Sequence, residues 1–137
     1  MSGFSDLNGL WTGSFGYSVS GMAAVSFTVW LDEKDGNIGG TIMEVNSFAA
    51  SPAEDLSSTI NGARSGLELA FTKLYDAGQG AHDTPIHYAG KINRDFTWIV
   101  GRWRIPSESN WSGPFEMSRQ SGTLEKAKRT RTAELVE

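Results

Sequence analysis

Apolar and polar residues alternate along much of the chain between residues 9 and 119. In residues 22–31, for example, apolar side chains occupy every second position from Val25 to Leu31, with Ser26, Thr28 and Trp30 between them. Successive side chains of a β-strand point to opposite faces, so this pattern predicts a strand with one buried face. The same reasoning predicts eight short strands, at residues 9–17, 22–31, 38–45, 59–64, 67–75, 86–93, 96–105 and 113–119.

The segments between these strands carry turn residues. Asp35-Gly36-Asn37 is typical of a hairpin tip, because Gly and Asn tolerate positive φ. Longer loops are expected at 47–58, where Ser51-Pro52 could begin one helical turn, at 76–85 and at 106–112. Consecutive short strands favour an all-β fold, an eight-stranded antiparallel up-and-down β-barrel that leaves no exposed sheet edge.

Residues 9–17 predict a strongly curved first strand. Trp11, Phe15 and Tyr17 share a face with Gly13, and Gly permits the bend of a small barrel wall. A barrel of about eight strands is either filled by its own side chains or just wide enough for one small ligand. The residues expected to point inward are Trp11, Phe15, Tyr17, Val25, Phe27, Val29, Ile42, Leu69, Phe71, Tyr88, Trp103, Phe115 and Met117.

The length of 137 residues is that of one domain, and we expect the barrel to occupy residues 1–120. Residues 121–137 are polar and contain four of the 12 Lys and Arg residues. They are expected to form either a polar tail or a short helix capped by Thr123.

The composition of the chain argues against several classes of function. A net charge of -4 argues against a nucleic-acid partner, and the absence of Cys excludes disulfides and Cys-based catalytic or metal sites. No run of 18 apolar residues predicts a membrane-spanning helix, and Met1–Asn8 lack the features of a signal peptide. A cytoplasmic location is therefore expected.

Gly9-Leu10-Trp11 at the start of the barrel and Arg119 at its end resemble the signature of the calycin barrels, which include lipocalins, fatty-acid-binding proteins and avidins. The resemblance implies that Trp11 lies across the closed end of the barrel and that Arg119 packs over it. The rhythm of residues 9–16 is most similar to the first strand of avidins. However, Gly13 and Tyr17 stand where avidins carry a ligand-binding Asn and Ser, so biotin is not the expected ligand.

If the barrel holds a ligand, the residues expected to bind it are Phe15, Tyr17, Phe27, Phe71, Tyr88 and Trp103. Small-molecule sites are mostly apolar with a few polar groups that fix orientation. Tyr17 and Tyr88 are the best polar candidates, because a buried hydroxyl seeks a partner. The alternatives are that these side chains simply fill the core, or that the two hydroxyls reach water at the rim.

Other polar residues are weaker candidates. Arg102 and Arg104 share a face with Trp98 and either hold a carboxylate or form a solvated outer face, which is the favoured interpretation. Trp30 and Trp98 should point outward, either as an interface or under a loop. His82, Asp83 and His87 lack the geometry of a metal site, and no metal is expected.

Three isolated carboxylates lie on predicted strands, and the outer solvated face is the expected position for each of them: Glu44, Glu68 and Glu116. An inward Glu would be notable, because an unpaired buried charge is costly.

The sequence contains no G-x-S-x-G, H-E-x-x-H or phosphate-binding loop, and no cofactor is expected. The leading hypothesis is a non-enzymatic barrel that binds a small apolar or amphipathic molecule. A second hypothesis is an isomerase or cyclase working inside the barrel, which needs inward polar residues. A third is a filled barrel that binds proteins through Trp30 or Trp98, with a homodimer as one form.

Overall fold

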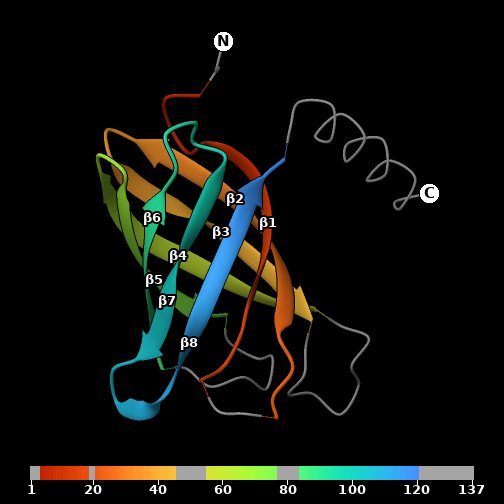
Figure 1. Ribbon diagram of the computed structural model, residues 1–137. Helices are drawn as coiled ribbons and strands as arrows, with labels where there is room; N and C mark the ends of the chain where they lie inside the picture. Colours follow the sequence, from red (N-terminus) through yellow and green to blue (C-terminus); the bar gives the residue numbers. More distant parts are fainter. Residues whose placement is uncertain (1–3, 19–20, 46–54, 77–83, 121–137) are drawn as a thin grey trace, which may run out of the picture.

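The eight predicted strands are present and close into an antiparallel barrel (Figure 1). The computed structural model describes residues 4–18, 21–45, 55–76 and 84–120. Each strand pairs with the next in sequence, and β8 returns to β1, with Trp11 opposite Arg119. The strands are β1 (Gly9–Phe15), β2 (Val25–Lys34), β3 (Asn37–Val45), β4 (Asp55–Ser65), β5 (Glu68–Tyr75), β6 (Ile86–Ile92), β7 (Trp98–Ile105) and β8 (Glu108–Arg119).

Some predicted boundaries were wrong. β4 begins at Asp55 and β8 at Glu108, inside segments expected to be loops. Ser57 and Ser58 belong to the ladder with β3, so tertiary pairing overrides the weak strand preference of Ser. At β8 the pairing continues through a register shift near Ile105, which the alternation pattern does not reveal.

Leu69 and Phe71 are buried as expected, whereas Leu67 is exposed. It precedes the first residue of β5, next to the Gly66 turn at positive φ. Ser51-Pro52 and the 121–137 segment lie outside the described residues. None of the described residues form a helix long and apolar enough to cross a membrane.

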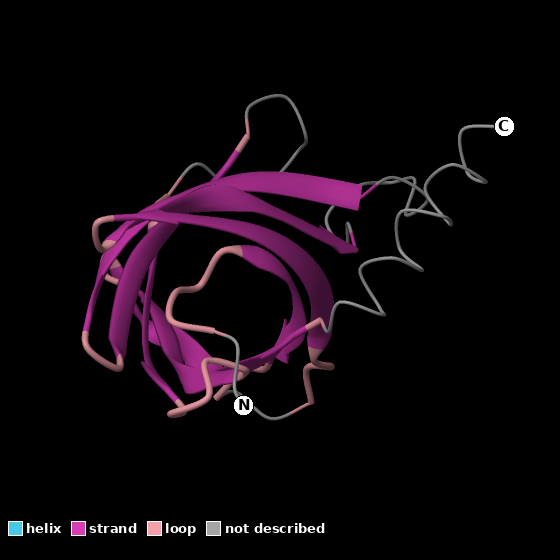
Figure 2. Ribbon diagram, turned by 90° about the horizontal axis from the view of Figure 1, so that it is seen from above, coloured by secondary structure: helices cyan, strands magenta, loops and turns pink. Residues whose placement is uncertain are grey.

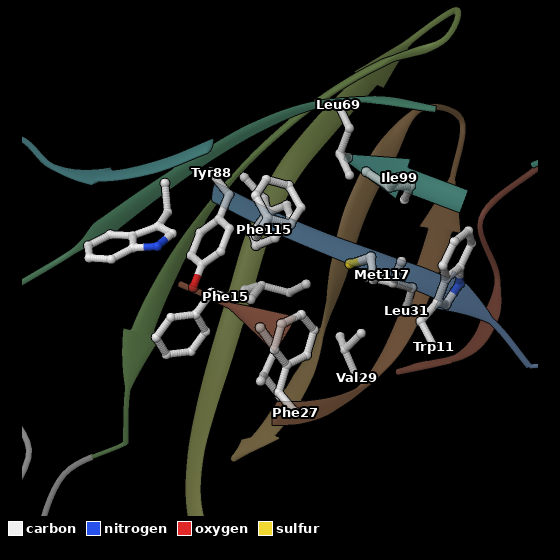
Figure 3. Close-up of a cluster of buried hydrophobic side chains, with 14 of the residues drawn as sticks. Trp11, Phe15, Phe27, Val29, Leu31, Leu69, Tyr88, Ile99, Phe115 and Met117 are labelled. Carbon is white, nitrogen blue, oxygen red and sulfur yellow. The ribbon is translucent and has the colours of Figure 1, made fainter. Parts of the chain in front are cut away.

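The inner faces of the strands form one hydrophobic core (Figure 3). Eleven of the 13 side chains expected inside are buried, and Tyr17 and Val25 pack half-buried against them. Trp30 and Trp98 are exposed on the outer wall, as the alternation predicted. The period of two therefore identified both faces of the barrel wall.

Gly13 lets β1 and β8 approach each other closely. A Cβ at this position would overlap the carbonyl oxygen of Glu116 and lie 2.8 Å from the Cα of Met117. Any larger residue would push the two strands apart at the seam that closes the barrel. The close approach of β1 and β8 therefore requires glycine at position 13.

The end of the barrel nearest Trp11 is covered by the segment before β1, which passes across the opening in Figure 2. Leu7 in this segment is fully buried, and its carbonyl accepts a hydrogen bond from the Trp11 indole N–H at 3.1 Å. The Arg119 guanidinium lies 5.1 Å from the centre of a Trp11 ring. This is the relation between the two residues that the resemblance implied.

Arg119 also ties three parts of the chain together. Its guanidinium donates to the backbone carbonyls of Asp6 at 2.9 Å, Phe96 at 2.8 Å and Asn8. These carbonyls belong to the segment before β1 and to the turn between β6 and β7. One buried cation therefore satisfies backbone groups that would otherwise be unpaired at this end of the barrel.

Replacement of Trp11 by Ala should lower the free energy of unfolding by about 3–5 kcal/mol, because it leaves a large cavity under Arg119. Urea denaturation measures this change. Trp98→Ala is the control, since Trp98 is 47% exposed and its loss should cost far less. A change below about 1 kcal/mol for Trp11→Ala would contradict its role in closing the barrel.

Candidate ligand-binding site

A cavity of about 630 Å³ lies at the other end of the barrel. Its walls come from the ends of β1, β5 and β7, the beginnings of β6 and β8, and the neighbouring loop residues. The lining residues are Phe15, Tyr17, Met22, Lys73, Tyr75, Thr84, Ile86, Tyr88, Trp103, Ile105, Glu108 and Trp111. Half of these are aromatic, so a ligand here would meet mainly ring surfaces.

Four of the six residues predicted to bind a ligand line this cavity: Phe15, Tyr17, Tyr88 and Trp103. Phe27 and Phe71 do not. Phe27 stacks on Phe15 with ring centres 6.3 Å apart, and Phe71 stacks on Tyr88 at 4.8 Å. The two Phe rings therefore support the cavity wall from behind, and the phenol of Tyr88 is directed toward Phe15 in Figure 3.

The aromatic wall is held in place by ring contacts and one hydrogen bond. The indole N–H of Trp103 donates to the carbonyl of Gly16 at 2.7 Å. Tyr17 meets both Trp103 and Trp111 edge to face, with centroid distances of 5.5 and 5.8 Å. Such contacts fix the orientation of each ring, so this side of the cavity is preformed.

A buried polar cluster of Glu44, Lys73 and Tyr75 reaches the cavity through Lys73 and Tyr75. The Lys73 ammonium donates to Glu44 Oε2 at 2.8 Å, and the Tyr75 hydroxyl donates to Glu44 Oε1 at 2.6 Å. Glu44 is 3% exposed, Lys73 1% and Tyr75 7%. Both carboxylate oxygens therefore have a donor inside the barrel.

The prediction that Glu44 belongs to the outer solvated face was wrong. Glu44 follows Ile42 by two positions on β3 and so shares its inward face. Lys73 and Tyr75 likewise continue the inward alternation of Leu69 and Phe71 on β5. The alternation of the two strands already placed these side chains on the inward face. However, a charged side chain is rarely fully buried without a partner, so the outer face was the expectation. That partner comes from a distant strand.

Aromatic rings surround the ammonium of Lys73. Its Nζ atom lies 4.7 Å from the ring centres of Phe15 and Tyr75 and 5.5 Å from that of Tyr88. Burial lowers the pKa of Lys73, and the nearby Glu44 carboxylate opposes this shift. The negative ring faces and the carboxylate together stabilise a cation that has little contact with water.

The other sequence candidates lie elsewhere. Glu68 and Glu116 are exposed, as expected, and Glu68 pairs with Lys91 at 3.2 Å. Arg102 and Arg104 are exposed, and Arg102 donates to the Ser18 hydroxyl. These two arginines take no part in the cavity lining.

The histidine cluster is only partly within the described part of the chain. His87 is exposed on β6, with its Nδ1 atom 3.5 Å from the hydroxyl of Thr72, and His82 and Asp83 lie outside the described residues. Within the described ranges, no three acidic or histidine side chains gather in a way that could hold a metal ion.

A second hollow of about 840 Å³ involves β1, β2, β3 and β8. Five of its lining side chains are Ser or Thr: Thr12, Ser14, Ser26, Thr28 and Ser118. These residues alternate with the inward positions of their strands, so the hollow lies against the outer wall. It lacks the aromatic enclosure of the interior cavity.

Comparison of the sequence with protein-family models and with curated proteins gives no match. The cavity is therefore the feature from which a function can be inferred.

All three tyrosines of the chain line the cavity, so tyrosine ionisation reports on this site alone. Burial raises the pKa of Tyr75, Tyr88 and Tyr17, and the Glu44 carboxylate raises it further. Above pH 10 the unfolded chain loses tyrosine protons that the native protein keeps, so stability should fall as pH rises. The lowered pKa of Lys73 opposes this trend up to about pH 10.5, where the unfolded lysine also loses its proton.

We therefore expect tyrosinate absorbance to stay low above pH 10.5 and then to appear together with unfolding, followed by near-ultraviolet circular dichroism. Each tyrosine that stays protonated in the native state should contribute a slope of about 1.4 kcal/mol per pH unit. Reversible ionisation of all three tyrosines near pH 10 without loss of structure would show that their hydroxyls face bulk water.

Lys73→Met should lower the free energy of unfolding by about 3–5 kcal/mol, because it leaves Glu44 buried with a carboxylate but no cation. Adding Glu44→Gln in the same chain should recover most of this loss, since the remaining amide is uncharged. Lys91→Met is the matched control, because the Lys91–Glu68 pair is exposed and its loss should change stability little. Equal effects of Lys73→Met and Lys91→Met in urea denaturation would contradict a buried ion pair.

Proposed function

We propose that this protein binds a small apolar or amphipathic molecule in the cavity at the end of the barrel. The observation that carries the proposal is the cavity of about 630 Å³, half of whose lining residues are aromatic. Small-molecule sites in proteins have volumes of roughly 300–1,000 Å³, with apolar walls and a few polar groups. The hydroxyls of Tyr17 and Tyr88 would supply polar groups here.

We further propose that the protein is a calycin-like binding barrel. The closed eight-stranded topology and the packing of Arg119 over Trp11 support this assignment. Within that group, biotin is not the proposed ligand, because Gly13 provides no side-chain partner for a ureido group. The proposed ligand is instead one that matches aromatic walls.

A barrel enzyme of the isomerase or cyclase type is the second candidate. It is favoured by the inward position of Glu44 and Lys73, the kind of ionisable pair that such an enzyme would need. Against it, both oxygens of Glu44 already accept hydrogen bonds, so the carboxylate is poorly placed to accept a proton from a substrate. Binding without reaction is therefore the better-supported function.

The interaction-module hypothesis has weaker support. Trp30 and Trp98 are exposed, but they lie on β2 and β7, and β8 and β1 separate these strands in the barrel wall. Single exposed hydrophobic residues are common on protein surfaces. A homodimer formed through either side chain stays a prediction.

The binding function can be tested with the uncharged fluorescent probe N-phenyl-1-naphthylamine. We expect one probe molecule to bind per barrel, with enhanced fluorescence and the corresponding added mass in native mass spectrometry. Ile105→Trp should weaken this binding at least about tenfold, because Ile105 lines the cavity and a larger ring would fill it.

Thr41→Trp is the control, since Thr41 is exposed on the outer wall of β3 and the same ring there should leave binding unchanged. Circular dichroism would establish that both variants fold. The proposal fails if the native protein binds no probe, or if Ile105→Trp binds it as well as the native protein does.

A further inference from the structure

The buried ion pair at the cavity constrains the charge of a ligand. A lysine ammonium in an apolar cavity is an ordinary anchor for a ligand carboxylate. Here the protein supplies that carboxylate itself, because Glu44 Oε2 lies 2.8 Å from Lys73 Nζ. The second oxygen of Glu44 is also satisfied, by the Tyr75 hydroxyl at 2.6 Å. The cation that could attract an anion is already paired.

The two charges sum to zero in a place that has little contact with water. The side chains of Lys73 and Glu44 are 1% and 2% exposed. A ligand with a charged inner end would add an unpaired charge among aromatic rings, which is costly. An anion that displaced Glu44 from Lys73 would leave the Glu44 carboxylate buried with no cation, which is equally costly.

A neutral hydrogen-bonding group beside the pair remains available. Tyr88 is 3% exposed and lines the cavity. Its hydroxyl makes no hydrogen bond to another residue in the described part of the chain, whereas Tyr75 is committed to Glu44. A phenol can donate to or accept from an uncharged oxygen, so it can orient a neutral ligand without adding charge.

We propose that Glu44 is a built-in counter-ion of Lys73 and makes the cavity select uncharged ligands. These ligands are apolar or aromatic molecules with one hydroxyl or carbonyl oxygen at the inner end. The Tyr88 hydroxyl binds that oxygen. Glu44 thereby determines specificity by occupying the place of a ligand carboxylate. This inference rests on the proposed binding function and adds the charge class of the ligand.

The test uses two probes of the same shape and different charge, 2-naphthalenemethanol and 2-naphthoate, titrated by isothermal calorimetry. At about pH 6 the naphthoate carboxyl is ionised, and the Lys73 amine holds its proton more readily than at neutral pH. The native protein should bind the alcohol at least about tenfold more tightly than the carboxylate.

Glu44→Gln should reverse this order, because it frees the Lys73 ammonium to pair with the carboxylate of 2-naphthoate. The double variant Glu44→Gln with Lys73→Met removes both charges and should bind the alcohol but not the carboxylate. Since it contains no unpaired charge, this second variant tests the charge rule even if Glu44→Gln alone folds poorly. Tyr88→Phe should weaken binding of the alcohol in the native background and leave that of unsubstituted naphthalene unchanged.

The outcomes separate the two proposals. If the native protein binds 2-naphthoate as tightly as the alcohol, or if the double variant still takes up the carboxylate, the charge rule is overturned while the binding function stands. If Glu44→Gln folds but gains no affinity for 2-naphthoate, Glu44 is not the determinant of specificity. If neither the native protein nor any variant binds a naphthalene probe or N-phenyl-1-naphthylamine, the binding function itself is overturned.

Discussion

Closure of the sheet is the constraint on which the rest of this structure depends. Once β8 pairs with β1, every strand has one face toward a single enclosed interior and one face toward solvent. Closure also requires close approach of the first and last strands, which Gly13 permits. No inward side chain can then reach water by moving past a sheet edge, so an inward charged group must find its partner within the barrel.

The two ends of the barrel solve this requirement in different ways. At one end Arg119 donates to three backbone carbonyls and covers Trp11, so its charge is used to close the structure. At the other end Lys73 and Glu44 neutralise each other beside an aromatic cavity. Arg119 thus helps to close one end of the barrel, whereas the Lys73–Glu44 pair at the other end lies beside a cavity. This difference distinguishes the closed end of the barrel from the end that holds the cavity.

Much of the fold could be predicted because it depends on a local period. Alternation identified the barrel topology, the inward aromatic residues and the outward Trp30 and Trp98. It did not reveal the beginnings of β4 and β8, where long-range pairing and a register shift determine the strand ends. The site was harder, since Phe27 and Phe71 have the same inward phase as Phe15 and Tyr88. Only their depth along the barrel axis, which sequence does not give, places them behind the cavity wall.

The Glu44–Lys73 pair was missed for a different reason. Their inward phase was readable, but a buried charge becomes plausible only when its partner is known, and the two residues are 29 positions apart. Closure places β3 and β5 on either side of β4, so inward side chains from both can meet. The sequence therefore predicts the barrel and its two faces well, whereas the buried ion pair can be recognised only from the three-dimensional arrangement.

The most direct test of the central claim is a crystal structure of the protein with 2-naphthalenemethanol. We predict that the naphthalene ring lies between Trp103 and Tyr88 and that the hydroxyl of the probe forms a hydrogen bond with the Tyr88 hydroxyl. The Glu44–Lys73 pair should remain intact. A cavity filled by rearranged protein side chains, or the probe bound only on the outer wall, would contradict the account.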